Sequence, residues 1–234
     1  MPERNISLSP RKEDIRNKNS VVTPAVQFDL DQIKAHFYEN LNDVRKQFDI
    51  ADKLFSEGKT DEAQNIWRSQ VVFVEGLMDF YLHEISKYAL VKMFKGEWDK
   101  TDKYNNFMIP MSTVELGLRN PESTEWLFDR INKRFSREVY MSGEALRQQL
   151  SLIGMNYDDI CKNAFPKEKG KNYIPGSDRL KMIYQRRNQI AHQSDRIHET
   201  AEKEAIDKKT VESYINTIRL FVEEIHSNAA QKEQ

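Results

Sequence analysis

The chain of 234 residues has little cysteine, glycine or proline, and it has no long apolar run. Cys161 is the only cysteine, so a disulfide within the chain is excluded, which suits a reducing compartment. The 8 glycines and 7 prolines are too few for a loop-rich all-β architecture. No stretch of about 18 apolar residues occurs, and the N-terminus lacks the apolar run of a signal peptide. We therefore expect an intracellular protein without a membrane span.

The chain also lacks an excess of charge of one sign, since 36 basic and 37 acidic residues leave a net charge of -1. The broad positive field of a general duplex-binding protein is therefore missing, although a local RNA site is compatible with this balance. The zinc motif H-E-x-x-H and the phosphate-binding motif G-x-x-x-x-G-K-[ST] are absent as well. We accordingly predict neither a metal site nor a cofactor.

The residues that are present favour an all-α fold. Hydrophobic residues make up 38% of the chain and charged residues 31%, a balance typical of long, half-exposed helices. Residues 1–27 are polar and interrupted by Pro2, Pro10 and Pro24, and we interpret them as a disordered, flexible N-terminal arm. Residues 28–228 are predicted to form one helical domain, and residues 229–234 a C-terminal tail.

Apolar periodicity predicts two long helices at the start of this domain. The first runs from residue 29 or 31 to about residue 57, and Gly58 ends it. The second runs from about residue 60 to residue 94, is the most apolar segment, and is expected to be the central core helix. Residues 97–111 are predicted to be irregular. Shorter helices are then expected at 112–119, 122–139, 143–153 and 156–164, from residue 178 through the segment discussed next, and at 207–226.

Arg187, Asn188 and His192 form an R-N-x3-H sequence near the end of one of these helices. At about 100° per residue, Asn188 and His192 share a flank of the helix, whereas Arg187 and His192 point about 140° apart. The two side chains converge only if the helix ends or bends, or if a second subunit completes the site. The same rotation predicts Arg187 at the centre of the apolar face, where a cation needs a carboxylate, a phosphate or an open groove. The apolar residues that define this face are Leu180, Ile183, Tyr184, Ile190 and Ala191.

Glu75 is a carboxylate within the apolar stripe of the central helix, and Asp79 follows it one turn later. An acid in one stripe and an arginine in another suggest a buried pair between Glu75 and Arg187, because buried charges are nearly always paired. The alternative is that either side chain lies at the edge of its stripe and reaches water. We predict Glu75 and Asp79 as supporting acidic residues of the site.

The segment from Lys162 to Arg187 is locally basic, with eight basic residues against two acidic ones and hence a net charge of +6. A basic surface beside the motif would attract a phosphate backbone, although the lysines equally fit an ordinary solvated loop. Tyr184 is placed to stack on an unpaired base, or to pack in the core. The RNA-binding residues predicted from this segment are Lys169, Lys171, Arg179, Lys181, Tyr184 and Arg186.

The R-N-x3-H sequence, its place late in a helical chain and the long apolar helix before it resemble the HEPN superfamily, with an overall look similar to its RiboL-PSP-type branch. The resemblance implies an up-and-down helical bundle with additional short helices. It implies a metal-independent endoribonuclease with Arg187, Asn188 and His192 as catalytic residues, acting in the cytoplasm. It also implies a homodimer whose two motifs face one cleft, a role as a toxin or a stress or phage-defence effector, and an antitoxin or sensor protein as partner.

The residue types suit this chemistry. RNA carries its own nucleophile, the 2′-OH, so cleavage needs a base, an acid and a cation for the developing phosphorane charge. An imidazole serves both proton transfers near neutral pH, and a guanidinium holds phosphate oxygens through its fork of donors. Two other readings stay open. The chain is either a non-catalytic HEPN module that binds a nucleotide or a protein, or an unrelated helical scaffold in which R-N-x3-H occurs by chance.

Overall fold

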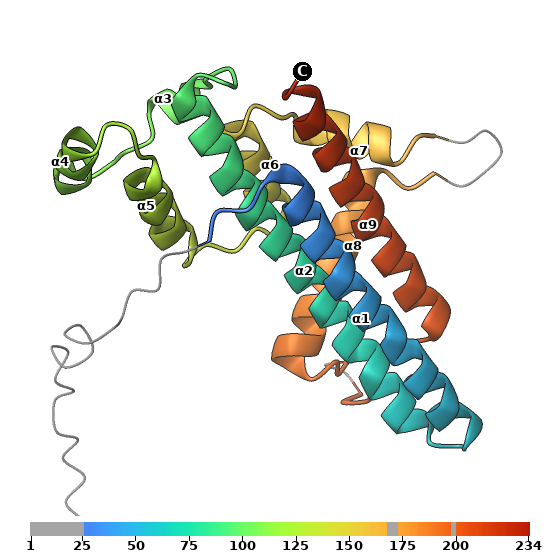
Figure 1. Cartoon of the computed structure of the whole chain (residues 1–234). Coiled ribbons are helices and arrows are strands. Elements are labelled where there is room, and N and C mark those ends of the chain that lie inside the picture. Colours follow the sequence, from blue (N-terminus) through green and yellow to red (C-terminus); the bar gives the residue numbers. More distant parts are fainter. Residues whose placement is uncertain (1–25, 168–172, 198–199) are drawn as a thin grey trace, which may run out of the picture.

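The computed structural model describes residues 26–167, 173–197 and 200–234, and within these ranges the chain forms nine helices and no strand (Figure 1). The all-α prediction is therefore confirmed. The helices are α1 (Leu30–Ser56), α2 (Thr60–Lys95), α3 (Asp102–Asn105), α4 (Met111–Arg119), α5 (Glu125–Phe135), α6 (Gly143–Leu152), α7 (Tyr157–Ala164), α8 (Gly176–Gln193) and α9 (Lys208–Gln231).

Helices α1 and α2 form an antiparallel hairpin that makes the most extensive helix–helix contact of the structure. Helix α1 begins with a capping box, in which the Asp29 carboxylate accepts from the Gln32 amide at 2.8 Å and the Gln32 side chain accepts from the Asp29 amide at 3.0 Å. Gly58 turns the chain with φ of 80°, a conformation that glycine adopts without strain. The apolar positions recognised in the sequence are the buried ones of α1, namely Leu30, Ile33, Phe37, Leu41, Val44, Phe48 and Ala51.

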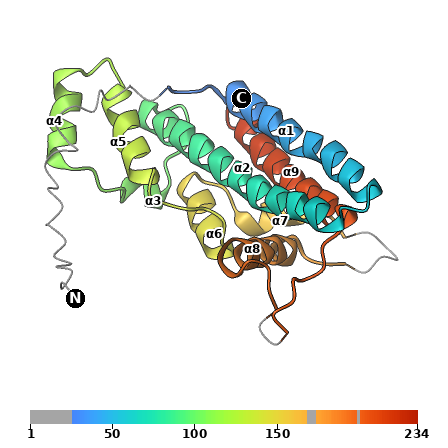
Figure 2. The same ribbon diagram turned by 90° about the horizontal axis from the view of Figure 1, so that it is seen from below.

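Helix α2 is the centre of the molecule, as its composition predicts. It packs against α1, α9, α8, α5 and α6, and it ends at Gly96 in the left-handed conformation. Figure 2 shows α1, α2 and α9 in one layer with α6, α7 and α8 beneath it, and α2 contacts both α1 and α8. Each fully buried apolar side chain stabilises this arrangement by about 1.5–3 kcal/mol, and Tyr81, Met78 and Leu82 of α2 are among the largest.

Helices α3, α4 and α5 extend beyond one end of the bundle (Figures 1 and 2). The four-residue helix α3 lies within the segment predicted to be irregular, and α5 is shorter at both ends than predicted. The N-cap of α3 explains the first difference, because the Thr101 hydroxyl accepts from the Tyr104 amide at 2.9 Å and also donates to the carbonyl of Leu152 at 3.0 Å.

The C-terminal end differs from the prediction as well. Helix α9 continues to Gln231, beyond the predicted end at residue 226, so residues 229–231 of the predicted tail are helical. Glu233 accepts from the Trp98 indole at 2.8 Å and from Lys92 Nζ at 3.0 Å, and these contacts hold the end of the chain on α2. They join residues 135 and 141 positions apart, so local sequence does not reveal them.

At the N-terminus, residues 1–25 of the predicted arm lie outside the described residues, and Val26 and Gln27 are exposed and non-helical. None of the described helices has the length and apolar character needed to cross a membrane.

Candidate active site

Helix α8 carries the R-N-x3-H motif and turns a different face to the core than the sequence predicts. Its buried residues are Gly176, Leu180, Ile183 and Arg186, whereas Tyr184 is half-buried and Ala191 is exposed. The buried face is therefore rotated toward Ile183 and Arg186. As a result, Arg187 is half-buried rather than at the centre of the core-facing side.

Arg186 is fixed in a buried ionic cluster, which is the reason for this rotation. Asp195 Oδ2 accepts from Arg68 Nε at 2.5 Å and from an Arg186 amino group at 3.0 Å. Arg186 also pairs with Glu204 and donates to the carbonyl of Ala205 at 3.1 Å. Because Arg186 is only 7% exposed, its prediction as an RNA-binding residue is corrected, and we assign it to holding the α8–α9 connection on α2.

Sequence reasoning missed Arg68 and Asp195, the other two members of this cluster. Arg68 lies on α2 two turns before Glu75, on the same side of the helix, and this spacing is a signal that was available. Asp195 gave no such signal. It adopts φ of 57° just beyond the end of α8, a left-handed conformation that aspartate tolerates better than most residues, and its carboxylate points back to the helix.

The three motif residues are split between a half-buried side and an exposed side of α8. Arg187 donates from a terminal amino group to the Asn188 side-chain carbonyl at 3.0 Å. Asn188 is half-buried, and His192 is exposed in the last turn of the helix. The helix ends only at Ser194, with φ of 54°, so it does not end between Arg187 and His192. Asn188 therefore links the arginine to the flank that carries the histidine.

Glu75 is fully buried opposite Arg187, and neither of its carboxylate oxygens has a hydrogen-bond partner. Burial raises the pKa of the Glu75 carboxyl to about 8, with Arg187 opposing the rise and Asp79 adding to it. The predicted Glu75–Arg187 ion pair does not form, although the two charges are near enough to interact. At neutral pH the Glu75 carboxyl is mostly protonated, so a buried neutral acid lies behind the motif arginine.

Asp79 has structural partners. Its carboxylate accepts from the backbone amide of Tyr140 at 2.5 Å and lies 3.6 Å from His83 Nε2. The bond from Tyr140 ties the segment between α5 and α6 to α2, whereas His83 lies on α2 itself. Asp79 thus contributes to the site through its charge, which raises the pKa of Glu75, and not through contact with Arg187.

The remaining RNA-binding predictions lie along the N-terminal half of α8 and the loop before it. Arg179 is half-buried, donates to the carbonyl of Ile174 at 3.0 Å and lies 5.4 Å from the centre of the Phe165 ring. Exposed Lys181 and half-buried Tyr184 line a pocket of about 370 Å³ that also includes Tyr157. Lys169 and Lys171 lie outside the described residues.

A second pocket, of about 400 Å³, opens between α2 and the C-terminal end of α8. We call it the α2–α8 pocket. It lies next to the ionic cluster, since Arg68 and Asp195 form part of its lining. The other residues of its lining are Asn65, Ser69, Val72, Phe73, Ile190, Ser194 and Lys203.

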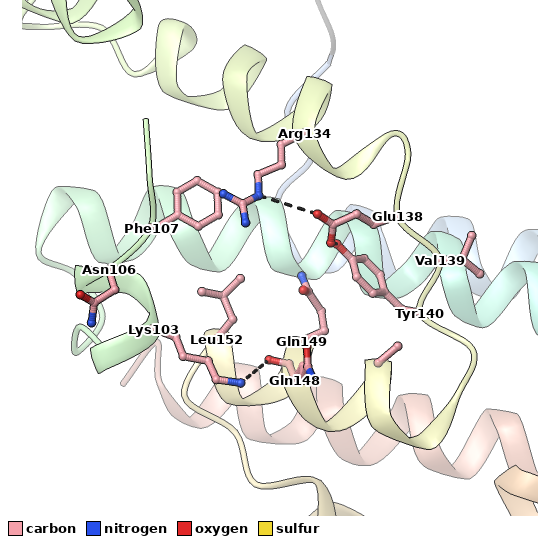
Figure 3. A pocket seen from close by; sticks show the side chains of 11 residues that line it. Lys103, Asn106, Phe107, Arg134, Glu138, Val139, Tyr140, Gln148, Gln149 and Leu152 are labelled. Atoms are coloured by element: carbon pink, nitrogen blue, oxygen red, sulfur yellow. Dashed lines mark hydrogen bonds and ion pairs between the residues drawn. The ribbon is translucent and has the colours of Figure 1, made fainter. Parts of the chain in front are cut away.

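A third pocket, of about 390 Å³, lies among α3, α5 and α6 (Figure 3). Arg134 stacks on the Phe107 ring at 4.3 Å and faces Glu138, and the side chain of Gln149 rises from α6 into the space between them. None of the predicted site residues lines this pocket. We therefore place the candidate active site at α8 and α2, away from it.

The fold and the motif together define an all-α, HEPN-type domain. A family model described as RiboL-PSP-HEPN matches residues 35–230, which reach from α1 to α9 and contain Arg187, Asn188 and His192. The chain belongs to the RiboL-PSP-HEPN family. No curated protein and no solved structure shows significant similarity to it.

Proposed function

We propose that this protein is a metal-independent endoribonuclease that cleaves RNA by attack of the 2′-OH on the adjacent phosphate. The observation that carries the proposal is the intact motif, in which Arg187 is held by Asn188 and His192 is exposed on the flank that Asn188 shares. An exposed imidazole and a guanidinium with donors to spare are the groups that this reaction requires.

In the proposed reaction, His192 takes the proton of the 2′-OH, and the 2′-oxygen forms a bond to phosphorus. Arg187 stabilises the negative charge of the phosphorane through its guanidinium. The bond from phosphorus to the 5′-oxygen then breaks, and the imidazolium of His192 gives the proton it has taken to the leaving oxygen. The products are a 2′,3′-cyclic phosphate end and a 5′-hydroxyl end. Asn188 positions Arg187 and has amide donors of its own for a phosphate oxygen.

The proposed active form is a homodimer with a composite site. Within one chain Arg187 and His192 point about 140° apart along a helix that does not end between them. A two-fold pair would place the exposed flanks of two α8 helices opposite each other, so the histidine of one chain meets the arginine of its mate. A nuclease of this kind needs restraint in a cell, and an antitoxin or sensor protein as partner is part of the proposal.

The experiment that tests this function is cleavage of single-stranded RNA in excess EDTA, followed by identification of the new ends. Cyclic-phosphate and 5′-hydroxyl ends would support the proposal, whereas 3′-hydroxyl ends would contradict the 2′-OH mechanism. A protein that remains monomeric and binds RNA without cutting it would favour the alternative of a non-catalytic binding module.

A further inference from the structure

The α2–α8 pocket lies one helical turn from Arg187 on its α8 wall and one helical turn from Glu75 on its α2 wall. Ile190 of α8 follows Arg187 by three residues, and Val72 of α2 precedes Glu75 by three residues. Residues three apart lie on the same side of a helix. The pocket therefore lies beside the place where Arg187 faces Glu75, toward the C-terminal end of α8.

The walls of this pocket are apolar and include one exposed aromatic ring. Phe73 is 52% exposed although it lies on the central core helix, and Val72 and Ile190 are half-buried beside it. Leaving a phenyl ring half in water forgoes part of its burial free energy. An exposed aromatic in the wall of a concave site suits a flat partner that covers the ring.

The rim of the pocket is polar and carries one positive charge that lies outside the buried cluster. Lys203 Nζ donates to Asn65 Oδ1 at 3.1 Å, and both side chains are exposed, as is the hydroxyl-bearing Ser69. The other charged lining residues, Arg68 and Asp195, neutralise each other in an ion pair. The pocket thus combines apolar walls for a flat ring, amide and hydroxyl groups for its polar edge, and a cation for a neighbouring phosphate.

We propose that the α2–α8 pocket binds an unpaired nucleobase of the RNA substrate next to the phosphate held by Arg187, with the base stacked on Phe73. This inference rests on the proposed ribonuclease function and adds a recognition site to it. The volume of about 400 Å³ is within the range of small-ligand pockets. Stacking on an aromatic ring is the usual way in which proteins hold single-stranded RNA bases, and it requires the target to be unpaired.

The test compares Phe73→Ala and Phe73→Trp in full-length protein that also carries His192→Ala, so that RNA binds without turnover. Binding of a fluorescein-labelled single-stranded oligonucleotide is measured by anisotropy. We expect Phe73→Ala to weaken binding about tenfold or more, and Phe73→Trp to retain it, with quenching of the new indole emission as RNA is added. The matched control is Phe94→Ala, which removes another exposed ring of α2, 41% exposed and outside this pocket.

Equal binding by Phe73→Ala and the control would overturn the inference. So would a loss of binding that accompanies a change from dimer to monomer in sedimentation, because Phe73 would then be an interface residue. These experiments distinguish a failure of the base-binding site from a failure of the ribonuclease proposal. Cleavage by the wild type that does not depend on Phe73 contradicts only the base site, whereas Phe73-dependent binding without any cleavage supports the base site and contradicts the nuclease.

Discussion

Arg187 donates a hydrogen bond to the side-chain carbonyl of its neighbour Asn188 at 3.0 Å. Consecutive residues of a helix point about 100° apart, so this bond draws the guanidinium around α8, from the side that faces Glu75 toward the flank of His192. The position of the arginine relative to the histidine therefore depends on Asn188, which explains why a polar residue directly follows the arginine in this motif.

Asn188→Ala should lower kcat/KM for RNA cleavage by about ten- to a hundredfold, because a misplaced guanidinium stabilises the phosphorane poorly. Asn188 is half-buried on the surface of α8, so the thermal unfolding temperature should change little. Steady-state cleavage and circular dichroism measure the two effects. Gln185→Ala, which removes an exposed amide one turn earlier on α8, is the control. If both variants cleave at the wild-type rate, Asn188 does not position Arg187.

Glu75→Gln should change how stability depends on pH. The Glu75 carboxyl has a pKa of about 8 in the folded protein against an ordinary value of 4.5, so between these pH values the folded state holds a proton that the unfolded state releases. The free energy of unfolding of the wild type therefore falls as pH rises through this window, by at most about 1.4 kcal/mol per pH unit from this group. The variant cannot lose this proton, and it should be the more stable protein at pH 9.

Urea denaturation from pH 4 to pH 9 measures this difference. The difference in the free energy of unfolding between the two proteins should be smallest near pH 4, should grow between about pH 4.5 and pH 8, and should level off above pH 8. A constant difference at every pH would contradict the burial of a protonated Glu75.

Arg187→Ala is expected to leave the protein folded, because Glu75 has no direct bond to lose and remains protonated at neutral pH.

Asp195→Asn should destabilise the protein strongly. It removes the carboxylate charge that Arg68 and Arg186 share, and these arginines are 6% and 7% exposed. Breaking a buried pair of this kind costs about 3–5 kcal/mol, and asparagine accepts the left-handed backbone at this position. Asp158→Asn, which removes the exposed partner of Arg147, should have a much smaller effect. Equal losses in urea denaturation would show that the Asp195 cluster does not hold the α8–α9 connection.

A mixture of two inactive variants should recover activity if the site is composite. Arg187→Ala and His192→Ala chains that exchange subunits form mixed dimers for about half of the pairs, and each mixed dimer keeps one intact arginine–histidine set. About a quarter of the wild-type rate is then expected, measured after co-refolding at equal concentrations. No recovery, with mixed dimers demonstrated by differently tagged chains, would mean that each subunit supplies its own arginine and histidine.

The long helices and the motif were predictable from the sequence because their signals are local. The buried positions of α1 follow directly from apolar spacing, since that helix turns a single face to the core. The facing of α8 was not predictable, because it depends on Arg186 meeting Asp195 and Glu204, which lie beyond the end of the helix. The lack of a hydrogen-bond partner for the Glu75 carboxylate was not predictable either. Apolar periodicity places Glu75 in the core but does not show which side chains reach it.

Cleavage of a mixed single-stranded RNA pool in excess EDTA, by the wild type and by His192→Ala side by side, tests the central claim most directly. His192 is exposed, so the variant should keep the fold and the oligomeric state of the wild type, which sedimentation and circular dichroism verify. We predict 2′,3′-cyclic phosphate ends from the wild type and none from the variant. Equal cleavage by both proteins would remove His192 from the mechanism and contradict the account.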